Sequence, residues 1–227
     1  PPRSTPLYSS AASDVYKRQP IYYDDNPVKI NLTNKLKEMV DRRSELSPYP
    51  IERIEVPFDD GKTISCLLHL LPDRRKAPCI IYVPGMDQTK EYFPKVMNNL
   101  AINRGMHVIS MDGPGQGNSN IQKIRAVGDN YERAGAAVMT YLQGREEIDS
   151  DKIGIYGVSM GSYWSLRLAS YDHRAAAIAS GVVTNKCNGG SGNTSINDAP
   201  SGLAIKYQKF AGSPNICLLY TSDSPDE

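Results

Sequence analysis

Short apolar runs alternate with helical segments between residues 77 and 183, and this alternation constrains the fold more than any other feature of the chain. Continuous apolar strands separated by helices are typical of βαβ units, in which helices cover both faces of a parallel sheet. The expected strands are "APCIIYVPG", "MHVISMDGPG", "KIGIYGV" and "AAAIASGVV", and the expected helices are "TKEYFPKVMNNLAINRG", residues 130–145 and "GSYWSLRLASYD". Such sheets carry their functional residues beyond the carboxyl ends of the strands.

Two further elements precede the alternating region. The stretch "NPVKINLTNKLKEMVDRRSEL" predicts an amphipathic helix, with Asn31 or Thr33 as its cap. Its apolar residues follow a helical spacing: Leu32, Leu36, Met39 and Val40. The stretch "IERIEVPFDDGKTISCLLHLLP" gives two β runs around the turn "DDGK", which predicts an antiparallel hairpin. The expected fold class is therefore α/β, a mostly parallel sheet with an antiparallel N-terminal hairpin.

Length and composition allow one α/β domain with a substantial core, because 40% of the 227 residues are hydrophobic and 22% are charged. Twenty-six basic residues against twenty-five acidic ones leave a formal charge of +1, which does not favour nucleic acid or anionic membrane as a partner. No apolar run approaches the roughly 18 residues of a membrane span, and no secretion signal is present. A cytoplasmic location is the resulting expectation.

The cysteines lack the close pairing of a zinc or redox site, and two of them fall within expected strands. They are Cys66, Cys79, Cys187 and Cys217. Buried reduced thiols are the expected state, with no metal site.

The coding sequences of the two chain ends can be reverse complements of each other. The two ends are "SSAASDVYKRQ" and "CLLYTSDSPDE". One coding of residues 14–19, reverse-complemented and shifted by one base, translates into residues 217–222. The same operation on residues 9–13 predicts the rest of the C-terminal end except Ser224 and Pro225. Inverted copies of one DNA element resemble a translated sequencing adaptor, and such segments do not contribute to the fold. The alternative is that both ends are ordinary flexible tails. The expected division is an artefactual tail (1–19), an N-terminal helical region (20–50), a core (51–184), the start of a cap (185–216) and a second artefactual tail (217–227).

The stretch "KIGIYGVSMGSYWSLRLA" places Ser159 in a Gly-x-Ser-x-Gly frame between an expected strand and an expected helix. This context is typical of a nucleophile elbow, where Gly157 and Gly161 are needed because side chains there would collide with the neighbouring strand and helix. The helix that starts near Met160 would direct free N–H groups toward charge developing beside the serine. Ser159 is therefore the candidate nucleophile.

A nucleophilic serine also needs an oxyanion hole. One N–H normally follows the nucleophile, which is that of Met160, and the second comes from the loop after an earlier strand. The loop "VPGMDQTKEYF" fits that place, with Met86 or Gly85 as the donor and Met86 favoured.

The stretch "MDGPGQGNS" closes the next strand with three glycines. It lacks the Lys-Ser/Thr ending of a P-loop and the Gly-x-Gly-x-x-Gly frame, so a nucleotide site is not expected. Asp112 is expected to orient this turn rather than to do chemistry.

The order of "PGMDQTKE", "DGPGQGNS" and "GVSMG" resembles the α/β-hydrolase superfamily, and the first two motifs are similar to the branch of 2,6-dihydroxypseudooxynicotine hydrolase and the FrsA-like esterases. The resemblance covers about residues 20–212. It implies a cofactor-free serine hydrolase acting on a small-molecule ester or on a carbon–carbon bond next to a ketone, under a helical cap.

The base of such a serine is missing from the expected place. In this fold the acid and the histidine follow the serine along the chain, yet His69 and His107 precede it. His173 follows Ser159 by about fourteen residues of helix, roughly 20 Å at 1.5 Å per residue, and is expected near the end of that helix. Asp198 has no expected strand before it and no histidine after it, so it is not assigned a role.

The sequence thus predicts a serine hydrolase present as a fragment, truncated before its last strands, with the triad acid and histidine outside this chain. Such a fragment is expected to be nearly inactive alone, with the strand over residues 175–183 as an apolar edge. The alternative is a non-catalytic binding or scaffold protein that kept the hydrolase fold.

Overall fold

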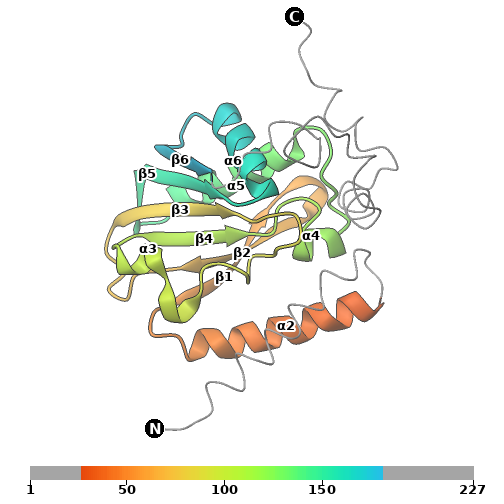
Figure 1. Ribbon diagram of the computed structural model, residues 1–227, viewed down its shortest axis with the longest axis horizontal. Helices are drawn as coiled ribbons and strands as arrows, with labels where there is room; N and C mark the ends of the chain where they lie inside the picture. The colour runs from red at the N-terminus through yellow and green to blue at the C-terminus, as the bar shows by residue number, and fades with distance from the viewer. Residues whose placement is uncertain (1–26, 181–227) are drawn as a thin grey trace, which may run out of the picture.

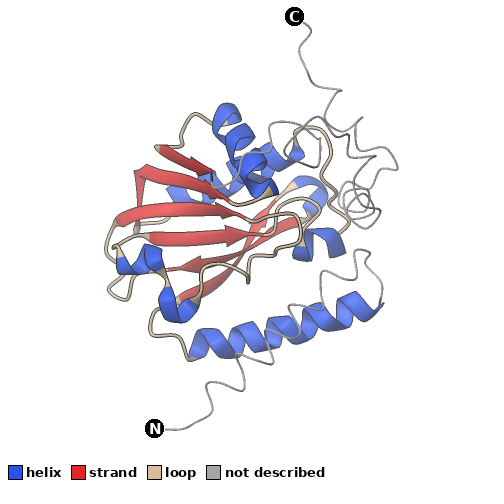
Figure 2. Cartoon of the chain, viewed as in Figure 1, coloured by secondary structure: helices blue, strands red, loops and turns tan. Residues whose placement is uncertain are grey.

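The computed structural model describes residues 27–180 of the chain. These residues form one sheet with helices on both of its faces (Figures 1 and 2). The strands are β1 (Ile51–Pro57), β2 (Thr63–His69), β3 (Ala77–Val83), β4 (His107–Met111), β5 (Ile148–Gly157) and β6 (Ala177–Ser180). The α-helices are α2 (Pro27–Glu45), α3 (Leu100–Asn103), α4 (Gly117–Ile121), α5 (Asn130–Gln143) and α6 (Met160–Tyr171).

The strands lie in the order β1-β2-β4-β3-β5-β6. β1 and β2 form the expected antiparallel hairpin, and β2 also pairs antiparallel with β4. β4, β3, β5 and β6 are parallel to one another, as their connecting segments predict. The mostly parallel sheet with an antiparallel N-terminal pair is confirmed, and the carboxyl ends of β3, β4 and β5 therefore meet at one edge.

Side chains alternate between the two faces of the sheet. Cys79, Ile81 and Val83 point to the face covered by α5 and α6, where they join the main core with Trp164 and Leu168. Ile80 and Tyr82, between them in β3, belong to a smaller cluster with Ala101, on the face covered by the loop before β4. Helix α2 packs on the second face through a third cluster made of Leu36, Val40, Leu67 and Ile51. Figure 1 shows α2 lying along the β1 side of the sheet.

The prediction of a helix over residues 89–105 is wrong for most of this segment. The segment consists of turns, a short 3₁₀ stretch (Val96–Asn98) and the single turn of α3. Pro94 lacks an N–H and disfavours helical backbone in the residue before it, so a regular helix through this point is strongly disfavoured. Helix α3 begins only after Asn99, whose side chain caps the N–H groups of Ala101 and Ile102.

The N-terminal helix is confirmed, but its expected caps are wrong. α2 already includes Pro27, so Asn31 and Thr33 lie inside the helix rather than before it. Proline is favoured in the first turn of a helix, where its missing N–H costs nothing. Two other boundaries also differ from expectation: β5 begins at Ile148, and the glycine-rich stretch after β4 contains the short helix α4.

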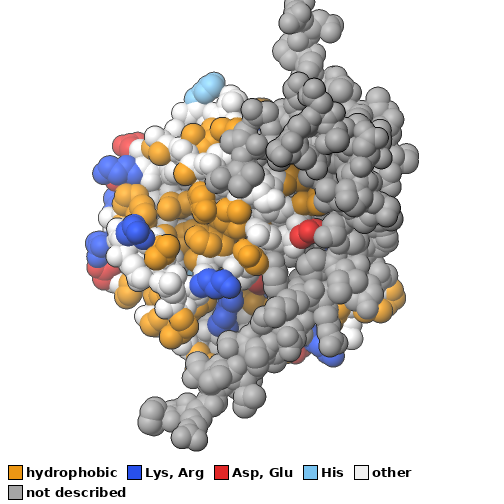
Figure 3. Space-filling view, viewed as in Figure 1, with side chains coloured by type: hydrophobic (Ala, Val, Ile, Leu, Met, Phe, Trp, Pro, Cys, Tyr) orange, Lys and Arg blue, Asp and Glu red, His pale blue; other side chains and the backbone are white. Residues whose placement is uncertain are grey.

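Apolar side chains gather on the face of the molecule seen in Figure 3. Met97 is 80% exposed in the segment before β4, and Tyr92 of that segment and Leu100 of α3 are also exposed. β6 lies at the edge of the described sheet, where Ile178 is exposed. No helix between residues 27 and 180 has the length and apolar character needed to cross a membrane.

Several expectations fall outside the described residues. The adaptor-like ends, the region expected to start a cap, and Cys187, Cys217 and Asp198 all lie before residue 27 or after residue 180. Cys66 and Cys79 are described, and both are buried free thiols, as expected. Burial raises the pKa of each of these thiols, which keeps them protonated.

Candidate active site

Ser159 occupies a strained turn between β5 and α6. β5 ends at Gly157 and α6 begins at Met160, so the expected sequence of strand, turn and helix is present. Ser159 has φ 57° and ψ −128°, a conformation that residues with a side chain rarely adopt. Its side chain is exposed, whereas Met160 beside it is buried. The turn therefore exposes the Ser159 hydroxyl to solvent, and it does so with a backbone conformation that is unfavourable for serine.

The glycines on either side of this turn permit close backbone approach. A Cβ atom placed on Gly157 would lie 2.2 Å from the carbonyl oxygen of Gly161. A Cβ atom on Gly161 would lie 2.2 Å from the carbonyl oxygen of Val83 in β3. Both distances are far below van der Waals contact, so the turn can form only with glycine at these positions.

The loop after β3 lies against Ser159. A Cβ atom built on Gly85 would be 3.1 Å from the Ser159 Cβ. Gly85 and Gln88 close a turn through a bond of 3.0 Å from the Gln88 N–H to the Gly85 carbonyl. The Gly85 N–H donates to Gln88 Oε1 at 2.9 Å, and Tyr82 Oη donates to the same oxygen at 2.8 Å. Because the Gly85 N–H already has an acceptor, the Met86 N–H is the better candidate for binding a ligand in this loop.

A buried glutamine joins this loop to the glycine-rich loop after β4. Gln116 Nε2 donates to the carbonyl oxygens of Gly85 at 2.7 Å and Pro84 at 3.1 Å. Gln116 Oε1 accepts from Tyr131 Oη at 2.8 Å and from the Gly113 N–H at 3.2 Å. All four hydrogen-bonding positions of the amide group are thus filled, which sets its orientation.

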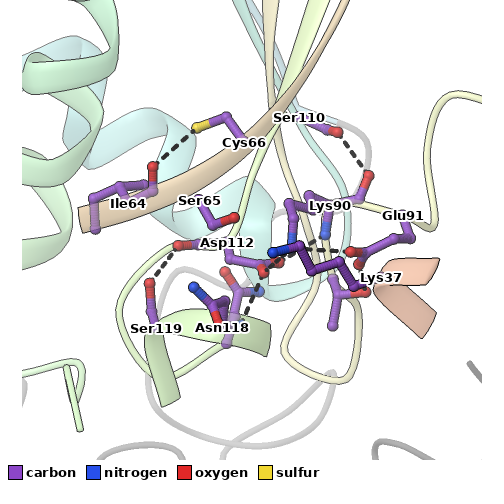
Figure 4. Close-up of polar contacts among 12 residues, drawn as sticks. Lys37, Ile64, Ser65, Cys66, Lys90, Glu91, Ser110, Asp112, Asn118 and Ser119 are labelled. Carbon is purple, nitrogen blue, oxygen red and sulfur yellow. Dashed lines mark hydrogen bonds and ion pairs between the residues drawn. The ribbon is translucent and has the colours of Figure 1, made fainter. Parts of the chain in front are cut away.

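Asp112 follows β4 and is fully buried, and Figure 4 shows its polar contacts with Lys90. Its carboxylate accepts from Lys90 Nζ at 2.7 Å, from the Lys90 N–H at 2.8 Å and from the Asn118 N–H at 2.9 Å. Lys90 Nζ also lies 2.9 Å from Glu91 Oε1. Asp112 therefore ties the loop after β3 to the loop after β4, which agrees with its expected role in orienting the turn.

Opposite charges in this cluster favour each other's ionised forms, although burial keeps the pKa of Asp112 above its ordinary value. Burial lowers the pKa of Lys90, but the Asp112 and Glu91 carboxylates more than reverse that effect and raise the pKa above its ordinary value. Burial raises the pKa of Asp112, whereas the Lys90 ammonium favours its ionised form. Removal of Asp112 would leave the buried Lys90 ammonium with Glu91 as its one carboxylate partner in this cluster, and loss of a partner from a buried ion pair is costly.

None of the three histidines lies near Ser159. His107 begins β4 and His69 pairs with the next residue, Val108, so both are at the opposite edge of the sheet. The Leu71 N–H donates to His107 Nδ1, and His69 Nδ1 lies 3.4 Å from Tyr49 Oη. Burial lowers the pKa of His69 to about 3, so its imidazole is neutral.

His173 lies beyond the far end of α6. The twelve residues of that helix span about 18 Å at 1.5 Å per residue. Asp172 is the C-cap residue, one position before His173. Among the described residues, none of these histidines is therefore placed as a base for Ser159.

Three residues of this edge were not found by sequence reasoning: Lys90, Gln116 and Tyr131. Lys90 lies within "PGMDQTKE" and Gln116 within "DGPGQGNS", but neither motif indicated a role for these side chains, and Tyr131, the second residue of α5, belongs to neither. Their partners are 15 to 32 residues away along the chain. Within the described range, no group of three or more His, Cys, Asp or Glu side chains is arranged to hold a metal ion.

The strand order, the elbow-like turn and the glycine-rich loops together define an α/β hydrolase fold, and the chain belongs to this family, whose model matches residues 78–194. The chain is similar to 2,6-dihydropseudooxynicotine hydrolase of Paenarthrobacter nicotinovorans, with 33% identity over 174 residues, 77% of this chain and 46% of that protein. It is 30% identical over 138 residues to "Hydrolase LUC6" of a Fusarium species, covering 57% of this chain and 33% of that protein.

A solved structure leads to the same branch of the family. The crystal structure of the 2,6-dihydroxy-pseudo-oxynicotine hydrolase matches with a TM-score of 0.73 and 26% identity, over 92% of this chain and 56% of that chain. The resemblance inferred from the sequence is thus confirmed. The chain spans about half the length, or less, of these relatives.

Proposed function

We propose that this chain carries the nucleophile and the oxyanion hole of a serine hydrolase, with Ser159 as the nucleophile. The observation that supports this most is the exposed Ser159 at φ 57°, held between two close-packed glycines at the start of α6. Backbone strain of this kind persists only where the surrounding structure imposes it, and it concentrates at functional sites. A serine that merely closed a turn would have no need of a conformation that glycine adopts more easily.

In the proposed reaction Ser159 Oγ attacks the carbonyl carbon of the substrate and passes its proton to a histidine. The carbonyl oxygen becomes an oxyanion, which accepts from the N–H groups of Met160 and Met86. Met160 is the first residue of α6, where the N–H has no acceptor within the helix and the dipole favours negative charge. The tetrahedral intermediate then collapses, and the histidine gives its proton to the leaving group, which departs as an alcohol from an ester or as the protonated carbon fragment if the bond is carbon–carbon. Water, deprotonated by the same histidine, attacks the acyl-enzyme, and the histidine returns the proton to Ser159 Oγ as a carboxylic acid is released.

We propose that the histidine and its acidic partner come from a longer protein of which this chain is a part. The support is twofold: all three histidines of the chain are far from Ser159, and the chain spans about half of its relatives. A small-molecule substrate is supported by the similarity to 2,6-dihydropseudooxynicotine hydrolase. The chain by itself would react slowly, because a serine without its general base loses about 10⁴-fold or more in rate.

The test is labelling with a fluorophosphonate, which reacts covalently with activated serines. The protein encoded by the uninterrupted gene and the 227-residue chain are treated in parallel, and the labelled peptide is identified by mass spectrometry. We expect the longer protein to be labelled at Ser159 and the chain to react at least about a thousandfold more slowly.

Two variants of the longer protein complete the test. Ser159→Ala should abolish labelling, whereas Ser170→Ala should not change it, because Ser170 is an exposed serine near the other end of α6. Unchanged labelling of Ser159→Ala would refute the proposal. A gene that ends without a downstream histidine and acid, together with no labelling, would favour the non-catalytic scaffold instead.

A further inference from the structure

We propose that Gln116 is a positioning residue for the oxyanion hole: it fixes the peptide between Gly85 and Met86 so that the Met86 N–H faces Ser159. The inference rests on the proposed function and deepens it. Gln116 would touch neither substrate nor Ser159. Its effect would pass through the backbone of the loop after β3.

The direction of the Met86 N–H follows from the bonds of the Gly85 carbonyl. Gly85 O accepts from Gln116 Nε2 at 2.7 Å and from the Gln88 N–H at 3.0 Å. A trans peptide is planar, and its N–H points away from its C=O. With the carbonyl held by Gln116 on one side, the Met86 N–H must be directed to the other side, away from Gln116.

The preceding peptide is held in the same way. Pro84 O accepts from Gln116 Nε2 at 3.1 Å, and the Gly85 N–H donates to Gln88 Oε1 at 2.9 Å. Both peptides that flank Gly85 are thus immobilised by two buried or half-buried glutamine side chains. Gly85 itself packs against the Ser159 Cβ, so this rigid segment lies beside the exposed hydroxyl.

Gln116 is itself held in place by two donors. Tyr131 Oη and the Gly113 N–H both donate to its Oε1, so the amide cannot rotate without losing hydrogen bonds on both sides. The Tyr131 ring is stacked on Trp164 at a centroid distance of 4.5 Å, and Gly113 leaves room for it, since a Cβ there would lie 2.4 Å from the ring. Gln116 is 2% exposed, which makes each of these bonds costly to lose.

The hydrogen bonds of Gln116 are all made, and they lie next to the candidate oxyanion hole. They would therefore hold the Met86 N–H in position before the substrate binds. Oxyanion donors accelerate a reaction because they need no reorientation when charge develops. A displacement of the order of 1 Å at such a donor costs about 100-fold in rate. Loss of Gln116 should therefore slow the chemical step without weakening the first binding of a reagent.

The experiment uses the longer protein and measures the fluorophosphonate reaction as two constants, the limiting rate kinact and the half-saturating concentration KI. Gln116→Met keeps the side-chain length and removes both polar groups. We expect kinact to fall about 10- to 100-fold, with KI within about twofold of the unsubstituted protein.

The matched control is Gln122→Met. The Gln122 side chain also binds backbone: its Oε1 accepts from the Thr63 N–H at 3.0 Å, and its Nε2 donates to the Thr63 carbonyl at 2.9 Å. Neither bond involves the loop after β3. Its kinact should be unchanged. If Gln116→Met does not fold, Tyr131→Phe removes only the donor to Gln116 Oε1 and should lower kinact roughly three- to tenfold.

The outcomes separate this inference from the function on which it rests. Persistent labelling of Ser159→Ala overturns both. Labelling that requires Ser159, but with kinact unchanged in Gln116→Met and Tyr131→Phe, overturns the positioning role alone. A change confined to KI, or an equal loss in Gln122→Met, also overturns it, because either result would mean a general effect on binding or folding.

Discussion

Buried polar groups lie at both ends of the parallel strands, but their surroundings differ. At the edge where β3, β4 and β5 end, here called the elbow edge (residues 83–90, 112–118 and 157–160), charged and amide side chains hold backbone loops in place and leave Ser159 exposed. At the opposite edge, here called the histidine edge (His69, His107, Tyr49 and Asn99), the imidazoles are buried and neutral. Hydrogen bonds and ion pairs at the elbow edge thus surround the exposed Ser159, whereas the imidazoles at the histidine edge are buried.

Substitutions at the two edges should therefore differ in how much they lower the free energy of unfolding. Polar groups at the elbow edge act on one another across two loops, so removing one leaves its partners buried without bonds. Polar groups at the histidine edge bond mainly to backbone or to neutral side chains, and their stability depends on staying uncharged. The following three expectations test this contrast in the free energy of unfolding.

The largest effect is expected for Asp112→Ala. It leaves the buried Lys90 ammonium with only Glu91 beside it and two backbone N–H groups without an acceptor, which should destabilise the fold by about 3–5 kcal/mol. Urea unfolding followed by circular dichroism measures this. Asp149→Ala, which removes an exposed ion pair with Lys152, is the matched control and should have little effect. Equal stability of Asp112→Ala and the parent chain would mean that the elbow edge is not braced by this ion pair.

A smaller effect is expected for Gly157→Ala in the last position of β5. The added methyl group would meet the Gly161 carbonyl at 2.2 Å, so the turn must shift, at about 1–3 kcal/mol. Gly154→Ala in the same strand is the control, because its nearest atom would be 3.5 Å away. Thermal unfolding of both variants should lower the melting temperature only for Gly157→Ala. A similar decrease in both would point to the strand in general rather than to the close-packed turn.

The smallest effect is expected at the histidine edge and depends on pH. The pKa of His69 is lowered to about 3 by burial, so below its ordinary pKa near 6.5 the unfolded chain takes up a proton that the folded chain does not. Stability should thus fall as pH decreases, by about 1–2 kcal/mol from this group between pH 7 and pH 5. His69→Gln should flatten that part of the pH profile. An identical profile in the variant would show that His69 is not held neutral.

The class of fold and the position of Ser159 could be predicted from local pattern. Apolar runs of strand length separated by helical segments suffice for a parallel sheet, and Gly157, Ser159 and Gly161 mark the sharp turn within five residues. The helix over residues 89–105 was predicted wrongly because its composition is helical in general, while Pro94 interrupts it and the Lys90 N–H is used by Asp112. Boundaries of this kind depend on contacts that no local window contains.

The sequence by itself determined the alternation of strands and helices and the glycines of the turn, because both are encoded in neighbouring residues or in their order. Only the tertiary structure decided which side chains brace the loops at the elbow edge. Gln116 reaches Gly85, and Lys90 reaches Asp112, because β3 and β4 are adjacent and parallel and so bring their following loops together. Hydrogen bonds between loops follow the order of strands in space, and that order is a property of the whole packed core.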